Sequence, residues 1–314
     1  MSWLTFSPIP RLRPRGLAAP LAGLSLAVAA AIALNAHPGS GIVVDAQQQV
    51  YFVDTGQGVW KIDAQGELTL IHTVAYHWMA LDEIGHFAKS EGLGEFDRGS
   101  FERVTPAGAL PALIISSDYP IAVGVDGALY YVPYNPNGPR ELVRRTPQGQ
   151  RSVFATLPTD SSPKPMLWVN GVTNGPDGFL YVTDNDSIHR IDRNGNVRPF
   201  RDSISSPECS DPLPDTPKPP YLRGLAVAAD GTIYAAANGC RALLRISAQG
   251  RSEIVVRSEP PWSPTGVAIS GNDIYVLEYF HIPADDRQAW IPRVRKISPD
   301  GTLRTLATIT RQPN

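Results

Sequence analysis

The sequence predicts an all-β fold, a six-bladed β-propeller of four-stranded antiparallel blades, and three observations support this prediction. First, 30 prolines and 27 glycines are spread along the 314 residues, which is typical of many short elements joined by tight turns. Second, similar glycine-containing turns recur at intervals of 41 to 55 residues. Third, short apolar and β-branched runs flank each turn, and such runs indicate antiparallel strand pairs.

The repeated turns define the units in chain order. Each turn ends in a glycine, which supplies the positive φ that closes a hairpin without steric cost. A second hairpin lies upstream, so each unit holds four strands, and six units close into a ring without exposed edges. The turn glycines are Gly66, Gly108, Gly149, Gly195, Gly250 and Gly301, and the expected blades are residues 40–71, 76–115, 119–155, 170–200, 223–256 and 265–309.

The first 36 residues read as a signal peptide or an uncleaved membrane anchor, followed by a single propeller domain over residues 37–314. Arg11, Arg13 and Arg15 precede an apolar run over residues 17–34, and the first 44 residues contain no acidic residue. The run is long for a signal sequence and near the minimum for a membrane span, so both readings stay open. Either way we expect an exported protein, periplasmic or extracellular, whose membrane contact is confined to a retained anchor.

The charge balance narrows the range of partners. The net charge is −2, which argues against a nucleic-acid surface because phosphate binding needs concentrated Lys and Arg. The expected partner is a small molecule, or a loop of another protein, at the mouth of the central channel.

Register locates this mouth, defined here as the face at which the innermost strands begin. Counting back 11 residues from an aromatic in the second strand, as from Tyr181 to Asn170, gives the residue that opens the innermost strand. The second strand returns to the same face and contributes an outer ring of side chains. The ligand-binding candidates on this face are Asn170, Arg223, Asp184, Glu278, Tyr119 and His77.

Oxygen ligands in one blade raise the prospect of a metal ion. Asn170 and Asp184 could serve a divalent cation such as calcium, magnesium or zinc. The alternative is that Asp184 caps its own turn through local hydrogen bonds.

The repeats resemble the NHL-repeat and gluconolactonase-like (senescence marker protein-like) propellers. The matching text is Pro264–Ser270 with Ile274–Val276, and Arg223–Val227 with Asp230–Tyr234, within a resemblance over about residues 40–309. It implies the fold, but not one activity, because these propellers include hydrolases, lyases and binding proteins.

The resemblance also implies a metal held by a Glu, an Asn and an Asp at the innermost strands. Only Asn170 matches, because Arg223 stands where the Asp is expected and residues 38–40 where the Glu is expected. A guanidinium cannot ligate a cation and would repel one.

Two functions therefore remain open, and with them whether the protein is an enzyme. The first is an exported propeller that binds a small anionic ligand or a partner loop, because Arg223 in a concave mouth suits a carboxylate or phosphate. The alternative is a lactonase, esterase or lyase with an altered metal site. Arg223 could also merely pair with Glu278 or Asp184 and close the channel.

The two cysteines predict a disulfide. Cys209 lies in a long connection over residues 201–222, and Cys240 follows the second strand of the fifth blade on the same face. In an oxidising compartment a lone pair of cysteines tends to be bridged. We expect a Cys209–Cys240 bond that fixes the connection over part of the mouth.

Overall fold

The computed structural model describes residues 38–87, 101–105, 111–117, 119–133, 135, 138–158, 166, 169–204, 209, 220–281 and 289–311. The predicted signal peptide or anchor lies outside these residues, so it stays a prediction. None of the helices found in the described ranges is long and apolar enough to cross a membrane.

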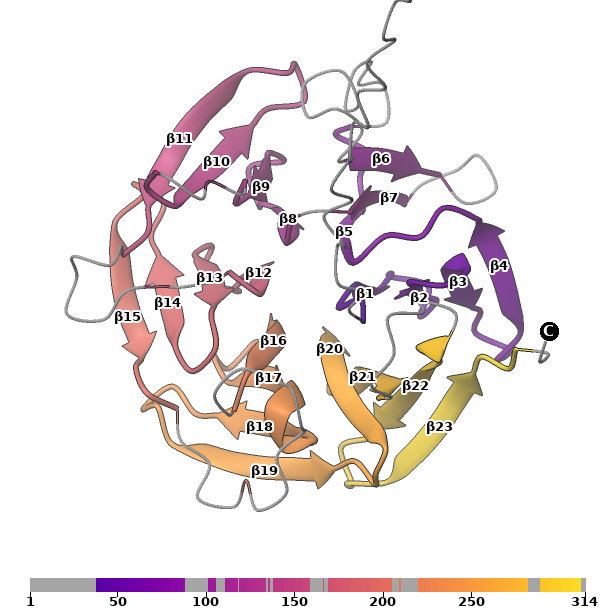
Figure 1. Ribbon diagram of the computed structural model, residues 1–314. Helices are drawn as coiled ribbons and strands as arrows, with labels where there is room; N and C mark the ends of the chain where they lie inside the picture. The colour runs from indigo at the N-terminus through magenta and orange to yellow at the C-terminus, as the bar shows by residue number, and fades with distance from the viewer. Residues whose placement is uncertain are drawn as a thin grey trace, which may run out of the picture. The chain divides into compact units, whose positions relative to one another are not determined.

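The described strands form six sheets arranged as blades around a central axis (Figure 1). The blades are antiparallel, as the sequence predicts, and their innermost strands begin within four residues of the expected positions. The first blade contains β1 (Ile42–Val44), β2 (Val50–Asp54), β3 (Gly58–Ile62) and β4 (Leu68–His72). The second contains β5 (Trp78–Asp82), β6 (Phe101–Val104) and β7 (Ala112–Ser116). The third contains β8 (Ile121–Val123), β9 (Leu129–Tyr131), β10 (Glu141–Arg145) and β11 (Arg151–Thr156).

The last three blades each contain four described strands in simple meander order. The fourth blade contains β12 (Gly171–Asn174), β13 (Leu180–Thr183), β14 (Ile188–Ile191) and β15 (Val197–Arg201). The fifth contains β16 (Leu222–Val227), β17 (Ile233–Ala237), the short 3-10 helix η2 (Asn238–Cys240), β18 (Ala242–Ile246) and β19 (Ser252–Arg257). The sixth contains β20 (Trp262–Ser270), β21 (Asp273–Phe280), β22 (Pro292–Ile297) and β23 (Leu303–Thr308).

The second blade departs from the predicted meander. Its described strands lie in the order β5, β7, β6, so the last strand in the sequence pairs with the innermost one. The carboxylate of Asp82 at the end of β5 accepts the backbone N–H groups of His86 at 2.9 Å and Phe87 at 2.8 Å and fixes a turn there. The register count predicts that Phe87, 11 residues after Tyr76, lies in a second strand. That prediction is wrong, because Phe87 lies in this turn.

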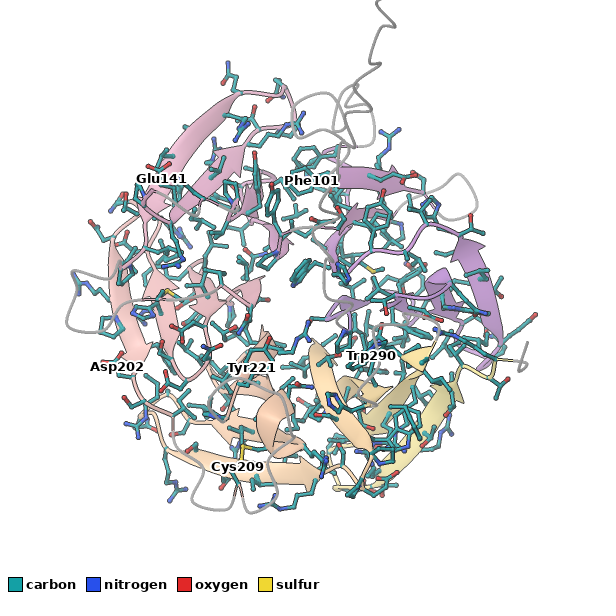
Figure 2. All side chains as sticks on the ribbon, viewed as in Figure 1. Phe101, Glu141, Asp202, Cys209, Tyr221 and Trp290 are labelled. Atoms are coloured by element: carbon teal, nitrogen blue, oxygen red, sulfur yellow. A yellow bond between two sulfur atoms is a disulfide. The ribbon has the colours of Figure 1, made fainter. Side chains whose placement is uncertain are left out.

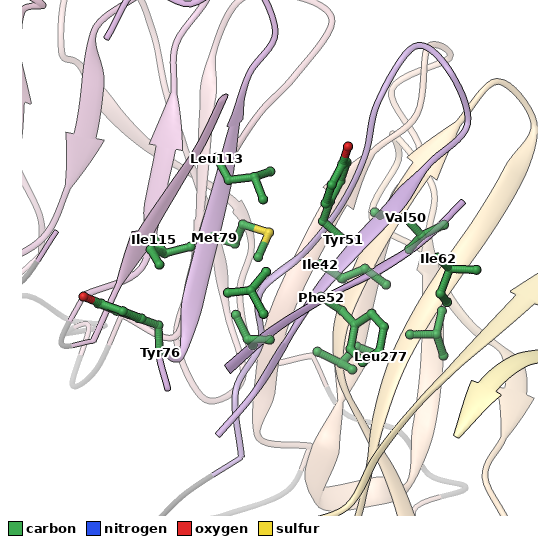
Figure 3. Packing of buried hydrophobic residues seen from close by; sticks show 14 of the residues in the cluster. Ile42, Val50, Tyr51, Phe52, Ile62, Tyr76, Met79, Leu113, Ile115 and Leu277 are labelled. Atoms are coloured by element: carbon green, nitrogen blue, oxygen red, sulfur yellow. The ribbon is translucent and has the colours of Figure 1, made fainter. Parts of the chain in front are cut away.

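Buried tyrosines on the second strands explain the aromatic register. Their hydroxyl groups donate to an aspartate in the turn before them, as Tyr130 does to Asp126 at 2.9 Å and Tyr181 to Asp177 at 2.8 Å. Burial and the nearby carboxylate raise the pKa of Tyr130 and of Tyr181 to about 12, so both keep their protons. Apolar residues on adjacent blades fill the space between the sheets, as Ile42 and Met79 do in Figure 3.

Glycines at the start of the innermost strands set the spacing between blades. A methyl group on Gly224 would lie 2.8 Å from the Cα of Gly266 and 2.9 Å from the carbonyl oxygen of Thr265. A methyl group on Gly171 would lie 2.7 Å from the carbonyl oxygen of Arg223. Glycine at the start of an innermost strand therefore allows the backbones of neighbouring blades to approach closely.

Cys209 and Cys240 form the predicted disulfide, with their Cα atoms 5.0 Å apart (Figure 2). The bond ties Cys209 to η2 in the fifth blade. Most of the connection that we expect to cover the mouth lies outside the described residues, so that expectation stays a prediction.

We predict that Gly224→Ala destabilises the fold by about 3 kcal/mol, the upper part of the usual range for overpacking, because both neighbours are backbone atoms that cannot rotate away. The measurement is urea unfolding. Gly271→Ala is the matched control, because Gly271 has a φ of +59° and no neighbour within 4 Å, so only backbone strain opposes its methyl group. An equal loss in the two variants would contradict the close-approach argument.

We predict that reducing the disulfide lowers the free energy of unfolding. The cysteines are 31 residues apart, which in the chain-entropy model corresponds to roughly 3 to 4 kcal/mol. Denaturant unfolding of the oxidised protein and of the double variant Cys209→Ser, Cys240→Ser measures the difference. Identical midpoints for the two proteins would refute this prediction.

Candidate functional site

The innermost strands surround a channel of about 370 Å³, lined by residues from all six blades. Burial changes along this channel. The strands are buried where they begin, as at Gly171 and Gly224, and more exposed where they end, as at Asn174 and Val227. The predicted mouth is therefore the more closed end of the channel.

Arg223 forms one bridge across this mouth. Its side chain leaves β16 in the fifth blade and reaches the segment that enters the first blade. Nε donates to the hydroxyl group of Ser40 at 3.2 Å, and Nη2 donates to the carbonyl oxygen of Pro38 at 2.6 Å. Because β20 of the sixth blade contacts both β16 and β1, this side chain links the two blades that flank the sixth.

No carboxylate among the described residues forms an ion pair with Arg223. The side chain is 5% exposed, and burial lowers the pKa of its guanidinium. Its ion-pair partners could have been Glu278 or Asp184, but neither pair forms, and no other carboxylate of the described residues pairs with it. Among the described residues, the hydrogen-bond partners of this buried positive charge are therefore neutral oxygen atoms.

Asn170 and Trp78 form a second bridge. The indole Nε1 of Trp78 in the second blade donates to the carbonyl oxygen of Asn170 in the fourth blade at 3.3 Å. The side-chain amide of Asn170 donates to the carbonyl oxygen of Leu222, next to Arg223, at 2.8 Å. The sequence placed Asn170 and Arg223 on one face, and the structure links them through adjacent residues. No role for Trp78 was predicted from the sequence, although Trp78 directly follows His77, one of the predicted mouth residues.

Asp184 is engaged in its own turn. One carboxylate oxygen accepts the hydroxyl group of Ser187 at 2.7 Å and the backbone N–H groups of Ser187 and Asp186 at 3.0 and 3.2 Å. This is the turn-capping arrangement that the sequence left open. Burial raises the pKa of this carboxyl group above its ordinary value.

Glu278 belongs to a buried ion cluster within the sixth blade. Its carboxylate accepts Nε of Arg293 at 2.5 Å, Nη2 of Arg295, and the hydroxyl group of Ser258 at 2.5 Å. Arg293 also pairs with Glu259, which holds the pKa of Glu259 at about 2. Glu278 is fully buried and does not line the channel, so its observed contacts are structural.

Tyr119 and His77 also lie beside the channel rather than in its lining. The ring of Tyr119 stacks on Tyr131 with centroids 6.1 Å apart. Nδ1 of His77 lies 2.6 Å from the carbonyl oxygen of Ser117, and its own carbonyl oxygen accepts the N–H groups of Ser40 and Gly41. Both residues therefore hold neighbouring connections in place.

The described residues do not fit the metal set that the sequence resemblance implies. Nowhere in the described ranges do three His, Cys, Asp or Glu side chains come close enough to hold a metal ion. Asp184 is bonded within its turn, and Arg223 brings positive charge to the face where Asn170 lies. We therefore derive no chemical step through a metal at this mouth.

No protein-family model matches the sequence, and no curated protein matches it. Solved structures do match the fold. A luciferin-regenerating enzyme is 16% identical with a TM-score of 0.54, over 86% of this chain and 94% of that one. Regucalcin from Agrobacterium tumefaciens strain C58, described as a calcium-binding protein, is 18% identical with a TM-score of 0.52, over 82% and 86%. A streptogramin B lyase is 17% identical with a TM-score of 0.50, over 88% and 86%.

These likenesses show the fold alone. The neighbours are six-bladed β-propellers, as the resemblance of the sequence implied, and the chain belongs to this class of structure. Its function has to be argued from its own residues.

We predict that Glu278→Gln destabilises the protein by about 3 kcal/mol, because it leaves two buried guanidinium groups without their shared carboxylate. Glu253→Gln is the control, since Glu253 pairs with Arg245 on the surface, where an ion pair contributes less than about 1 kcal/mol. Thermal and urea unfolding measure both variants. A small effect of Glu278→Gln would mean that the cluster is not structural.

Proposed function

We propose that this protein is an exported β-propeller that binds a small anion, a carboxylate or a phosphate, at the mouth of its channel. The single observation that carries the proposal is the buried guanidinium of Arg223, which has no carboxylate partner among the described residues. The anion is either a free small molecule or an acidic side chain on a partner's loop.

The hydrogen-bonding capacity of Arg223 supports this proposal. A guanidinium carries five N–H donors, and two of them are used by Ser40 and Pro38. A buried charge without an opposite charge is costly, so an anion on the remaining donors would offset that cost through charge-assisted hydrogen bonds. The side-chain oxygen of Asn170 and the indole of Trp78 lie in the same bridged mouth and could contact the uncharged part of the ligand.

The expected behaviour is a melting temperature that rises with phosphate or acetate concentration in the wild-type protein, because ligand binding to the folded state alone stabilises it. Arg223→Met should abolish the rise, and Arg223→Lys should keep part of it because the charge remains but the planar fork is lost. Removing the charge-assisted bond should weaken binding by about 1.5 to 3 kcal/mol in calorimetric titration.

Arg245→Met is the matched control, because Arg245 is an exposed arginine paired with Glu253 on the outer strands. It should leave anion binding unchanged. An equal response to anions in wild-type and Arg223→Lys proteins would contradict the proposed role of Arg223, even if Arg223→Met fails to fold.

The alternative function, a lactonase, esterase or lyase, is compatible with the fold, because the structural neighbours include a streptogramin B lyase and a luciferin-regenerating enzyme. Incubating the purified protein with a sugar lactone or an aryl ester tests it. Turnover that stops with a chelator and returns with calcium would favour this alternative over simple binding. Export is tested separately by fractionation and by sequencing the N-terminus of the mature protein.

A further inference from the structure

A second cavity, of about 350 Å³, lies between the third and fourth blades, away from the channel mouth. Part of its wall is apolar, and charged and amide side chains complete it. Tyr130 and Phe154 of the third blade meet edge to face with centroids 5.0 Å apart, and Leu180 and Ile191 of the fourth blade complete the wall. The volume lies within the range of small-molecule pockets.

Contacts between the two blades enclose this cavity on two sides. Toward the channel, the side-chain amide of Asn174 in β12 donates to the carbonyl oxygen of Val123 in β8. Toward the outside, Gly195 lies so close to the carbonyl oxygen of Phe154 that a methyl group there would overlap it. The cavity is therefore built by two inter-blade contacts and is more than a loose gap between sheets.

The negative charges at its rim are already engaged. Asp126 accepts Nε of Arg144 at 2.8 Å and Nη2 at 2.7 Å. Although burial alone would raise it, these bonds bring the pKa of Asp126 below its ordinary value, so the carboxylate stays ionised and paired. Asp192 accepts the backbone N–H groups of Asn194 and Asn196 within its own turn.

The positive charge at the rim, on Arg193, is hydrogen-bonded to a backbone carbonyl group and is not paired with a carboxylate of the described residues. Its Nη2 donates to the carbonyl oxygen of Asp177 at 3.2 Å. It lies against Gly178, where any side chain would collide with the guanidinium. Arg193 is an exposed side chain at the edge of the cavity, and its remaining N–H donors are available to a ligand.

We propose that this cavity binds a small carboxylate with a single-ring apolar body. The ring would lie against the wall that Tyr130, Phe154 and Leu180 form, where aromatic edges and faces favour it. The carboxylate would pair with Arg193, whose planar fork matches its two oxygen atoms. This site is separate from Arg223 and does not depend on the function proposed for the channel mouth.

The test is calorimetric titration of the full-length protein with phenylacetate and with its neutral analogue phenylacetamide, in a buffer free of phosphate and other carboxylates. Repeating the titration with Arg223→Lys separates this site from any anion site at Arg223, and the affinity should not change. We expect saturable phenylacetate binding that weakens at least tenfold in Arg193→Gln, whereas the much weaker binding of phenylacetamide does not change. Arg201→Gln is the matched control, because Arg201 is an exposed arginine at the end of β15 in the same blade and does not line the cavity.

The absence of saturable phenylacetate binding to the wild-type protein would overturn the proposal. So would binding that is equally strong in wild-type and Arg193→Gln proteins, or equally weakened by Arg201→Gln. A crystal of the complex with the ring outside the Tyr130–Phe154 wall would overturn it as well.

Discussion

Closing the ring without a shared strand is the constraint on which the rest of this structure depends. Each described sheet is made from one continuous segment, so no described strand pairs across the junction between the first and last blades. Side chains make that connection instead. Tyr279 donates to the carbonyl oxygen of Val53 at 2.7 Å, Arg311 pairs with Asp54, and Arg223 holds Pro38 and Ser40. Gly266 allows β20 to pack closely against Ser40.

This closure brings the candidate site and the stability of the ring together at one residue. Arg223 ties the fifth blade to the start of the first blade, and its charge is also the feature that suits an anionic ligand. An anion would relieve the cost of the buried charge without breaking either of its hydrogen bonds. Ligand binding at this position would therefore also tighten the junction between the chain's two ends.

Acidic residues near the mouth serve the fold. Asp184 and Glu278 satisfy nearby donors, in a turn and in an ion cluster respectively, because a buried carboxylate is costly unless hydrogen bonds surround it. Register counting predicts the end of the strand at which each residue lies, because successive strands run in opposite directions. It could not show that Arg293 and Arg295 point at Glu278, because that depends on the pairing of β21 with β22.

The sequence by itself determined the number of blades, most strand positions and the cysteine pair, because turns, alternation and glycine spacing are properties of neighbouring residues. It also predicted that Arg223 and Asn170 lie at the mouth. Tertiary structure decided the reversed order of β6 and β7, the bridge from Trp78 to Asn170, and which charges are neutralised. Those outcomes depend on contacts between residues far apart in the chain, such as the 185-residue separation of Arg223 and Pro38, which no local pattern encodes.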